Sequence, residues 1–232
     1  MNIFTKIYNQ TLKIFGDIKV YKYPFFLLYD PGSYTIKGAE SREIMNTLQP
    51  GDIIVRGYKN YLDGYFIPGF FSHVGLYLGP VPNTKKFNIL PYINKKFYAQ
   101  GDQVVVHSMA EGVFMEDILN FCRCDYLVIL RVNQNISRDE LDKIYLSALS
   151  KLGTPYDYKF DFSNFHNLSC TEFVYICMPD KLKQKGVFLR KRRKPFFLSP
   201  TLIPDDFINS SLELIWKSKD IPHGIIEKIK DE

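Results

Sequence analysis

Short runs of apolar and β-branched residues are separated along the chain by polar, turn-prone segments. We predict strands in five of these runs, over residues 52–56, 72–79, 103–108, 112–115 and 125–132. Apolar spacing near the helical period and helix-start signals predict helices over 1–16, 40–48, 117–121 and 137–152, and one more starting near Cys170. Antiparallel strands followed by a helix, a loop and a second helix predict an α+β fold.

The segments between these elements are rich in glycine, proline and polar residues. We predict a loop over 57–69, a surface insertion over 80–100, an aromatic loop over 155–167, a basic irregular stretch over 180–200 and short helical pieces over 201–232. The expected organisation has three parts: an N-terminal helix and extended arm packed on the core (1–40), a main domain (41–205) and a C-terminal helical tail (206–232).

Cys170 lies where a polar stretch gives way to an apolar run. Asn167 or Ser169 can cap a helix that starts here, and Glu172 lies in its first turn. A thiol at a helix N-terminus lies near the positive end of the dipole, which favours the thiolate. Cys170 is therefore a candidate nucleophile.

Composition narrows the class of protein. A hydrophobic content of 46% with 16% aromatic residues predicts a globular chain with a large core, and a net charge of +5 is modest. The dense basic cluster Arg190–Lys194 is first of all a solvated loop, so we expect no nucleic-acid partner. Of the four cysteines, Cys122 and Cys124 are too close for the usual zinc spacing, and the others form no ligand pair, so we expect neither a metal nor another cofactor.

The N-terminal segment has no continuous apolar core or small-residue cleavage site, and no apolar run approaches the roughly 20 residues that span a bilayer. Few cysteines and no export signal predict a cytoplasmic protein. Residues 1–16 also fit an interfacial helix, so peripheral membrane contact is an alternative to packing on the core. The oligomeric state is left open.

Thiol catalysis needs an imidazole beside the nucleophile and a polar group on the far nitrogen of that imidazole. His73 and His107 lie on consecutive predicted strands. A lone histidine in a strand is usually a core or surface residue, but two of them upstream of a helix-start cysteine favour a catalytic pair. His166, four residues before Cys170, is an alternative partner.

Several segments resemble, in order, the YiiX-like, circularly permuted branch of the NlpC-type papain-like cysteine hydrolases. The similarity spans roughly residues 45–205 and is carried by segments 48–54, 67–79, 111–113, 125–131, 153–162 and 168–175. Unpermuted members have the cysteine helix before the histidine strand, whereas here Cys170 follows His73 by 97 positions. The resemblance implies a permuted papain-like fold, with an antiparallel sheet or half-barrel packed against helices.

By this resemblance Cys170 is the nucleophile, His73 the general base and His107 the third residue. YiiX-like proteins often have a glutamate at the third position, and other branches, including relatives of lecithin retinol acyltransferase, have histidine. Glu111 is the alternative orienting group, although its Glu-Gly-Val context favours a hairpin turn. The backbone N–H of Cys170 and a hydroxyl of Tyr156 or Tyr158 are candidate oxyanion donors.

The leading functional hypothesis is a thiol hydrolase that cleaves an amide, of a peptide or peptidoglycan type, through an acyl-enzyme. One alternative is a lipid acyltransferase or thioesterase of the lecithin retinol acyltransferase type, with a lipid amide or ester as substrate and with the aromatic arm and basic cluster on a membrane. Another alternative is a non-catalytic binding module on the same fold.

Overall fold

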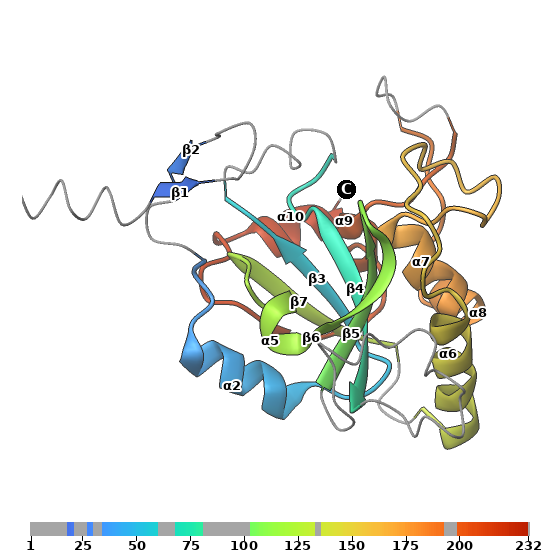
Figure 1. The fold of residues 1–232 in the computed structure, drawn as a ribbon, viewed down its shortest axis with the longest axis horizontal. Coiled ribbons are helices and arrows are strands. Elements are labelled where there is room, and N and C mark those ends of the chain that lie inside the picture. Colours follow the sequence, from blue (N-terminus) through green and yellow to red (C-terminus); the bar gives the residue numbers. More distant parts are fainter. Residues whose placement is uncertain are drawn as a thin grey trace, which may run out of the picture. The chain divides into compact units, whose positions relative to one another are not determined.

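The computed structural model describes residues 18–20, 27–29, 34–59, 68–80, 103–132, 136–192 and 199–231. The chain divides into two compact units, Met1–Thr35 and Ile36–Glu232. In the first unit, strands β1 (Ile18–Val20) and β2 (Leu27–Tyr29) pair antiparallel (Figure 1). The predicted helix over 1–16 and nearly all of the predicted insertion over 80–100 lie outside the described residues.

A six-stranded antiparallel sheet forms the centre of the second unit, with strand order β6-β5-β4-β3-β7-β8 (Figure 1). Its strands are β3 (Ile53–Gly57), β4 (His73–Pro80), β5 (Gln103–Met109), β6 (Gly112–Asp117), β7 (Tyr126–Arg131) and β8 (Glu213–Lys217). All five predicted strands are present, and the α+β class is confirmed.

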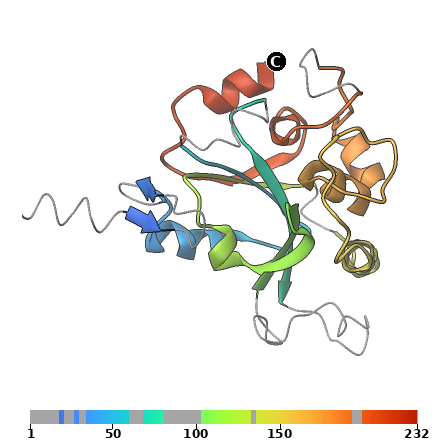
Figure 2. The same ribbon diagram turned by 45° about the horizontal axis from the view of Figure 1, so that its top comes forward.

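Helices cover both faces of this sheet (Figure 2). They are α2 (Gly38–Thr47), α5 (Ile118–Phe121), α6 (Arg138–Ser150), α7 (Cys170–Cys177), α8 (Pro179–Gln184), α9 (Pro204–Ile208) and α10 (Ile225–Asp231). Helices α6 to α10 pack on one face and helices α2 and α5 on the other, so that two apolar clusters sandwich the sheet. None of the helices in the described part of the chain has the length and apolar character needed to cross a bilayer.

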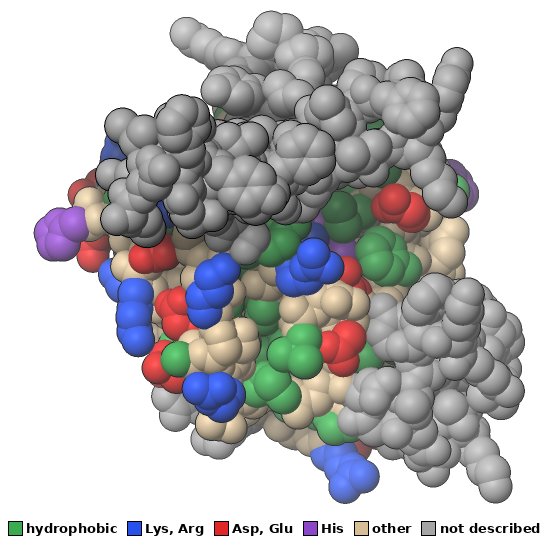
Figure 3. All heavy atoms as spheres, turned by 60° about the vertical axis from the view of Figure 1, so that its left-hand side comes forward, with side chains coloured by type: hydrophobic (Ala, Val, Ile, Leu, Met, Phe, Trp, Pro, Cys, Tyr) green, Lys and Arg blue, Asp and Glu red, His purple; other side chains and the backbone are tan. Residues whose placement is uncertain are grey.

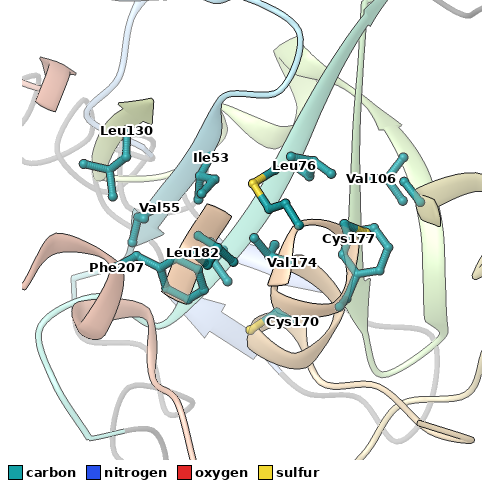
Figure 4. Packing of buried hydrophobic residues seen from close by; sticks show 14 of the residues in the cluster. Ile53, Val55, Leu76, Val106, Leu130, Cys170, Val174, Cys177, Leu182 and Phe207 are labelled. Carbon is teal, nitrogen blue, oxygen red and sulfur yellow. The ribbon is translucent and has the colours of Figure 1, made fainter. Parts of the chain in front are cut away.

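Side chains alternate between the two clusters along each strand, as the two-residue period of a strand requires. Ile53 and Val55 of β3 lie in the cluster under α7, whereas Ile54 lies in the cluster under α2. Figure 4 shows Val174 and Cys177 of α7 in the first cluster with the strand residues Leu76 and Val106. The sheet therefore holds α7 by apolar contacts all along the helix.

Two predictions of local structure are wrong. Residues 180–184, predicted to be irregular, belong to α8, which has Pro179 at its start. Residues 213–217, predicted within a region of helical pieces, form β8, because β7 offers an edge with which they pair, from Val128↔Lys217 to Arg131↔Glu213. The expected boundary between residues 205 and 206 falls inside α9, and the residues after it belong to the same unit as the sheet.

Charged side chains of both signs are interspersed on the face shown in Figure 3. The basic cluster predicted as a solvated loop is described as far as Arg192. Within it, Arg192 Nη2 lies 2.5 Å from Asp206 Oδ2, and Arg190 Nε lies 3.7 Å from Asp206 Oδ1. Asp206 thus binds two of the cluster's cations.

Candidate active site

Cys170 is the first residue of α7, and a capping box orders the helix start. Ser169 Oγ accepts the backbone N–H of Glu172 at 3.4 Å, and Glu172 Oε2 accepts the backbone N–H of Ser169 at 2.7 Å. Each side chain thus satisfies a backbone donor of the other residue. Of the two caps that the sequence allows, Asn167 and Ser169, the structure uses Ser169. The capping box fixes the direction from which the Cys170 side chain leaves the helix.

The start of α7 lies where two neighbouring strands separate. Strands β4 and β5 pair from Leu76↔Val106 outward to Pro80↔Gln103, so the first residues of β4 pair only with β3. In the gap, the backbone N–H of Val74 acts to lower the pKa of Cys170. Ser108 Oγ of β5 donates to the carbonyl of Leu168 at 2.5 Å. The segment that carries the thiol is therefore hydrogen-bonded to β5, and the helix it starts packs on both β4 and β5.

Asp205 of α9 holds the approach to His73 in place. Its two carboxylate oxygens accept the backbone N–H groups of Phe70, at 2.8 Å, and Phe71, at 2.9 Å. Gly69 has φ of +117°, and a Cβ there would lie 2.6 Å from Asp205 Oδ2. Only glycine fits this conformation so close to the carboxylate. The C-terminal part of the chain thereby helps to position β4.

The two predicted histidines contact each other directly. His73 Nε2 lies 2.9 Å from His107 Nδ1, and the two rings meet edge to face with centroids 5.0 Å apart. Phe121 packs against both rings, and its ring centroid lies 5.9 Å from that of His73 and 5.1 Å from that of His107. Gly75 makes room for it, because a Cβ there would lie 2.9 Å from the Phe121 ring. Because His73 Nε2 contacts His107, Nδ1 is the His73 ring nitrogen that remains to exchange a proton with another group.

Sequence reasoning missed two charged residues beside this pair, Glu116 and Arg56. Glu116 Oε2 lies 3.1 Å from His107 Nε2. Arg56 is 4% exposed, donates from Nη1 to the Phe121 carbonyl at 2.9 Å, and lies 3.8 Å from Glu116 Oε2. The predicted strand ended at residue 115, and β6 continues to Asp117. Phe114 and Glu116 alternate with the buried Val113 and Met115, and this signal could have found Glu116.

The surroundings of both histidines favour neutral imidazole. Burial, then the charge of Arg56 and then His107 lower the pKa of His73 well below its usual value. Burial also lowers the pKa of His107, and this outweighs the opposing effect of Glu116. Taking a cation out of water is unfavourable, and a fixed positive charge nearby adds to the penalty. His73 is therefore in its base form near neutral pH.

The thiol differs from expectation in its resting protonation state. Burial raises the pKa of Cys170 to about 11, and the backbone N–H groups of Val74 and Thr171 oppose that rise only in part. The prediction that the helix start favours the thiolate is wrong for this resting state, because Cys170 is 2% exposed. Burial raises the pKa further for Cys122 and Cys177, to about 12 each.

The other predicted residues lie at different distances from the thiol. Tyr156 is partly buried, and burial and its closeness to Cys170 raise its pKa, so its hydroxyl keeps a proton to donate. Tyr158 is 69% exposed and packs its ring 4.9 Å from that of Tyr156. Glu111 is exposed in the turn between β5 and β6, and His166 is exposed in the loop before α7. Of these four, Tyr156 is the residue whose pKa is affected by Cys170.

One trio of acidic side chains in the described part of the chain could converge on a cation. Asp157, Asp161 and Glu172 bring ligand oxygens within 4.8 Å of one another. Glu172 Oε1 accepts the N–H of Phe162 at 2.9 Å, and Asp157 Oδ1 accepts that of Lys159 at 3.0 Å. Burial raises the pKa of Glu172 to about 7. The carboxylates hold the aromatic loop against α7, and that role accounts for their convergence.

The fold and this cluster of side chains define a papain-like arrangement, with a cysteine at a helix start beside a histidine-bearing sheet. The chain belongs to the permuted papain-like amidase family, YaeF/YiiX, C92, whose model matches residues 47–193. At the level of the family this supports a cysteine-dependent amide hydrolase. The predicted YiiX-like membership is thus confirmed.

A solved structure that resembles this chain is the crystal structure of a protein described as the metalloprotein YiiX from Escherichia coli O157:H7. The two share 17% identity with a TM-score of 0.55, over 74% of this chain and 98% of that chain. At this identity the likeness shows the fold alone. No curated protein matches the chain.

Proposed function

We propose that this protein is a thiol amidase in which Cys170 is the nucleophile and His73 the general base. The observation that carries the proposal is that the start of α7 lies against β4, the strand whose first residue is His73. The backbone N–H of Val74, next to His73, acts to lower the pKa of Cys170, and His73 Nε2 lies 2.9 Å from His107 Nδ1. These are the groups that nucleophilic catalysis needs: nucleophile, base and orienting residue.

The first half of the reaction forms a thioester. As the sulfur attacks the amide carbonyl, His73 Nδ1 takes the thiol proton, because both groups are neutral at rest. The backbone N–H of Cys170, which the first turn of α7 leaves without an intrahelical partner, donates to the developing oxyanion. Tyr156 supplies a second donor. When the C–N bond breaks, the imidazolium returns its proton to the leaving amine.

The second half restores the enzyme. A water molecule loses a proton to His73 and attacks the thioester carbonyl. The C–S bond breaks, the carboxylic acid leaves and the sulfur regains a proton from His73. Each step uses the same imidazole first as base and then as acid. We propose a peptide or peptidoglycan-type amide as substrate, which the family's amidase description supports.

The YiiX protein, whose solved structure resembles this chain, is described as a metalloprotein. In this chain the trio of Asp157, Asp161 and Glu172 offers oxygen ligands, the kind that hard divalent cations prefer. Its oxygens accept the N–H groups of residues that shape the aromatic loop. We therefore assign the reaction to the thiol and the imidazoles, with no step through a metal ion.

Replacing the nucleophile tests the proposal. With a panel of peptide and peptidoglycan stem-peptide amides, we expect Cys170→Ala to lower turnover on the order of 10⁴-fold or more, because no other group can form the thioester. Intact mass spectrometry of the wild-type chain during turnover should show an acyl adduct that maps to Cys170. Cys177→Ala is the matched control, since Cys177 lies buried in the same helix.

An active Cys170→Ala variant would overturn the proposed mechanism, the more so if EDTA abolished its turnover and a divalent cation restored it. If neither the wild type nor the Cys177→Ala variant turned over or was acylated by any of the amides, while binding them, the non-catalytic module would be the better description.

A further inference from the structure

The outer end of the histidine pair faces an acidic side chain. His107 Nε2 and Glu116 Oε2 are buried and lie 3.1 Å apart, and neither atom has a hydrogen-bond partner among the described residues. The contact is short but poorly aligned with the N–H direction. The Glu116 side chain is 23% exposed. Such contacts in unliganded enzymes often tighten only when substrate binds. A proton on one of these two atoms can therefore form a hydrogen bond to the other.

The ionised carboxylate determines where that proton lies. Burial acts to raise the pKa of Glu116, but the contact with His107 and the charge of Arg56 outweigh it, and the pKa is lowered. An ionised carboxylate can only accept hydrogen bonds, so His107 must carry its proton on Nε2. His107 Nδ1 is then an acceptor, and His73 Nε2 must donate to it across 2.9 Å. A neutral His73 is left with a bare Nδ1.

We infer that Glu116 is a positioning residue that sets the tautomers of both histidines. It acts through His107 and not on the substrate. Its effect on turnover rests on the proposed function, because only a bare Nδ1 lets His73 accept the thiol proton. Its effect on the tautomers is independent of any activity.

The charges around His107 make one substitution decisive. Arg56 and Glu116 face the ring, and Glu111 acts on it from the exposed turn. Arg56 Nη1 and His107 Nε2 both approach the same oxygen, Glu116 Oε2, at 3.8 Å and 3.1 Å. A glutamine oxygen there would still accept from both groups, so the variant that removes the acceptor is Glu116→Leu. A buried N–H on His107 Nε2 then has no acceptor, which favours the proton on Nδ1. His107 Nδ1 donates to His73 Nε2, and a neutral His73 carries its proton on Nδ1, the wrong nitrogen for a base.

The test is nitrogen–proton correlation NMR of the imidazoles in the full chain, labelled with ¹⁵N at histidine, at a pH where both rings are neutral. In the wild type we expect both His73 and His107 to carry the proton on Nε2. In Glu116→Leu we expect both to carry it on Nδ1, and kcat to fall about 10²-fold or more with little change in KM. Glu227→Gln removes an equal charge from an exposed position of α10 and should leave both tautomers and kcat unchanged.

A wild-type spectrum with the proton on Nδ1 of either histidine would overturn the inference, and so would a Glu116→Leu spectrum that matches the wild type. Glu116→Asp keeps the carboxylate, so we expect it to preserve both tautomers and more turnover than the leucine variant. If Glu116→Leu does not fold, the wild-type and aspartate spectra decide. Failure of the proposed amidase would appear as absent turnover in the wild type and would leave these spectra readable.

Discussion

His73 lies in a buried site with a guanidinium and a second imidazole nearby, and all three conditions disfavour its cationic form. The thiol beside its strand is also neutral at rest, since burial raises the pKa of Cys170 to about 11. The resting site is therefore a neutral thiol and a neutral imidazole, and not a preformed ion pair. Proton transfer accompanies attack on the carbonyl, as in serine hydrolases. At the scale of single residues, the protonation state of the base sets the pH range of activity.

The charge of Arg56 should set the acid limb of the pH–rate profile. Protonation of His73 removes the base, and a lowered pKa keeps the base available below pH 6.5. Arg56→Gln removes a positive charge, so the pKa of His73 should rise, and the acid limb of kcat/KM should move up by about one pH unit. Arg56→Lys keeps the charge and serves as the control. A limb that stays in place in the glutamine variant would contradict this assignment.

Among the elements, β3 is central to the sheet and is anchored at its start by a buried ion pair. Arg131 donates to the two carboxylate oxygens of Asp52, from Nε at 2.7 Å and from Nη2 at 2.8 Å, and it also donates to the Thr47 carbonyl. Asp52 further accepts the N–H of Gln49 at 2.8 Å. One carboxylate thus joins the end of α2, the start of β3 and the end of β7. Removing one partner of a buried ion pair leaves the other charge buried without a counter-charge, which strongly destabilises the fold.

Asp52→Asn should destabilise the fold strongly without touching the histidine pair. It leaves Arg131 buried with no counter-charge, and the expected loss in the free energy of unfolding is about 3–5 kcal/mol, measured by chemical denaturation. Lys219→Ala removes an exposed cation 3.7 Å from Glu43 and should leave stability unchanged within error. A loss for Asp52→Asn no larger than that of Lys219→Ala would show that the pair does not brace the sheet.

Across the whole molecule, the C-terminal residues complete the sheet and the core. Strand β8 covers the edge of β7, and α9 holds the approach to His73 through Asp205. Four apolar residues beyond α9 are buried in the cluster under α7: Leu212, Ile221, Ile226 and Ile229. Without β8, β7 would present an unpaired strand edge, and the apolar surface that these four residues cover would be exposed to water. The chain thus depends on its last elements to support β4, the strand that carries His73.

Deleting residues 212–232 should therefore prevent stable folding. We expect the shortened chain to lose its cooperative thermal transition, followed by circular dichroism, and to aggregate in size-exclusion chromatography. A chain that ends at Lys230 keeps Ile229 and should behave as the full chain does. A truncated chain that still unfolded cooperatively would mean that the sheet is complete without β8.

Local signals in the sequence determined much of the architecture. Runs of β-branched residues marked five strands, and Ser169 with Glu172 marked the start of α7, because strand alternation and helix capping depend on residues a few positions apart. The pairing of His73 with His107 followed from two adjacent strands in an antiparallel sheet. That they are catalytic is a proposal that the contact supports.

Only the tertiary structure decided the rest. Glu116 and Arg56 join the site because β6 and β3 flank the histidine strands, and no local spacing links them to Cys170. Strand β8 exists because β7 offers it an edge. The thiol's pKa rises because burial depends on every segment packed around Cys170, whereas the dipole that predicted a thiolate is a property of one helix. Short-range interactions determined most of the elements, whereas long-range packing and desolvation determined strand β8, the contacts between elements and the protonation of the buried groups.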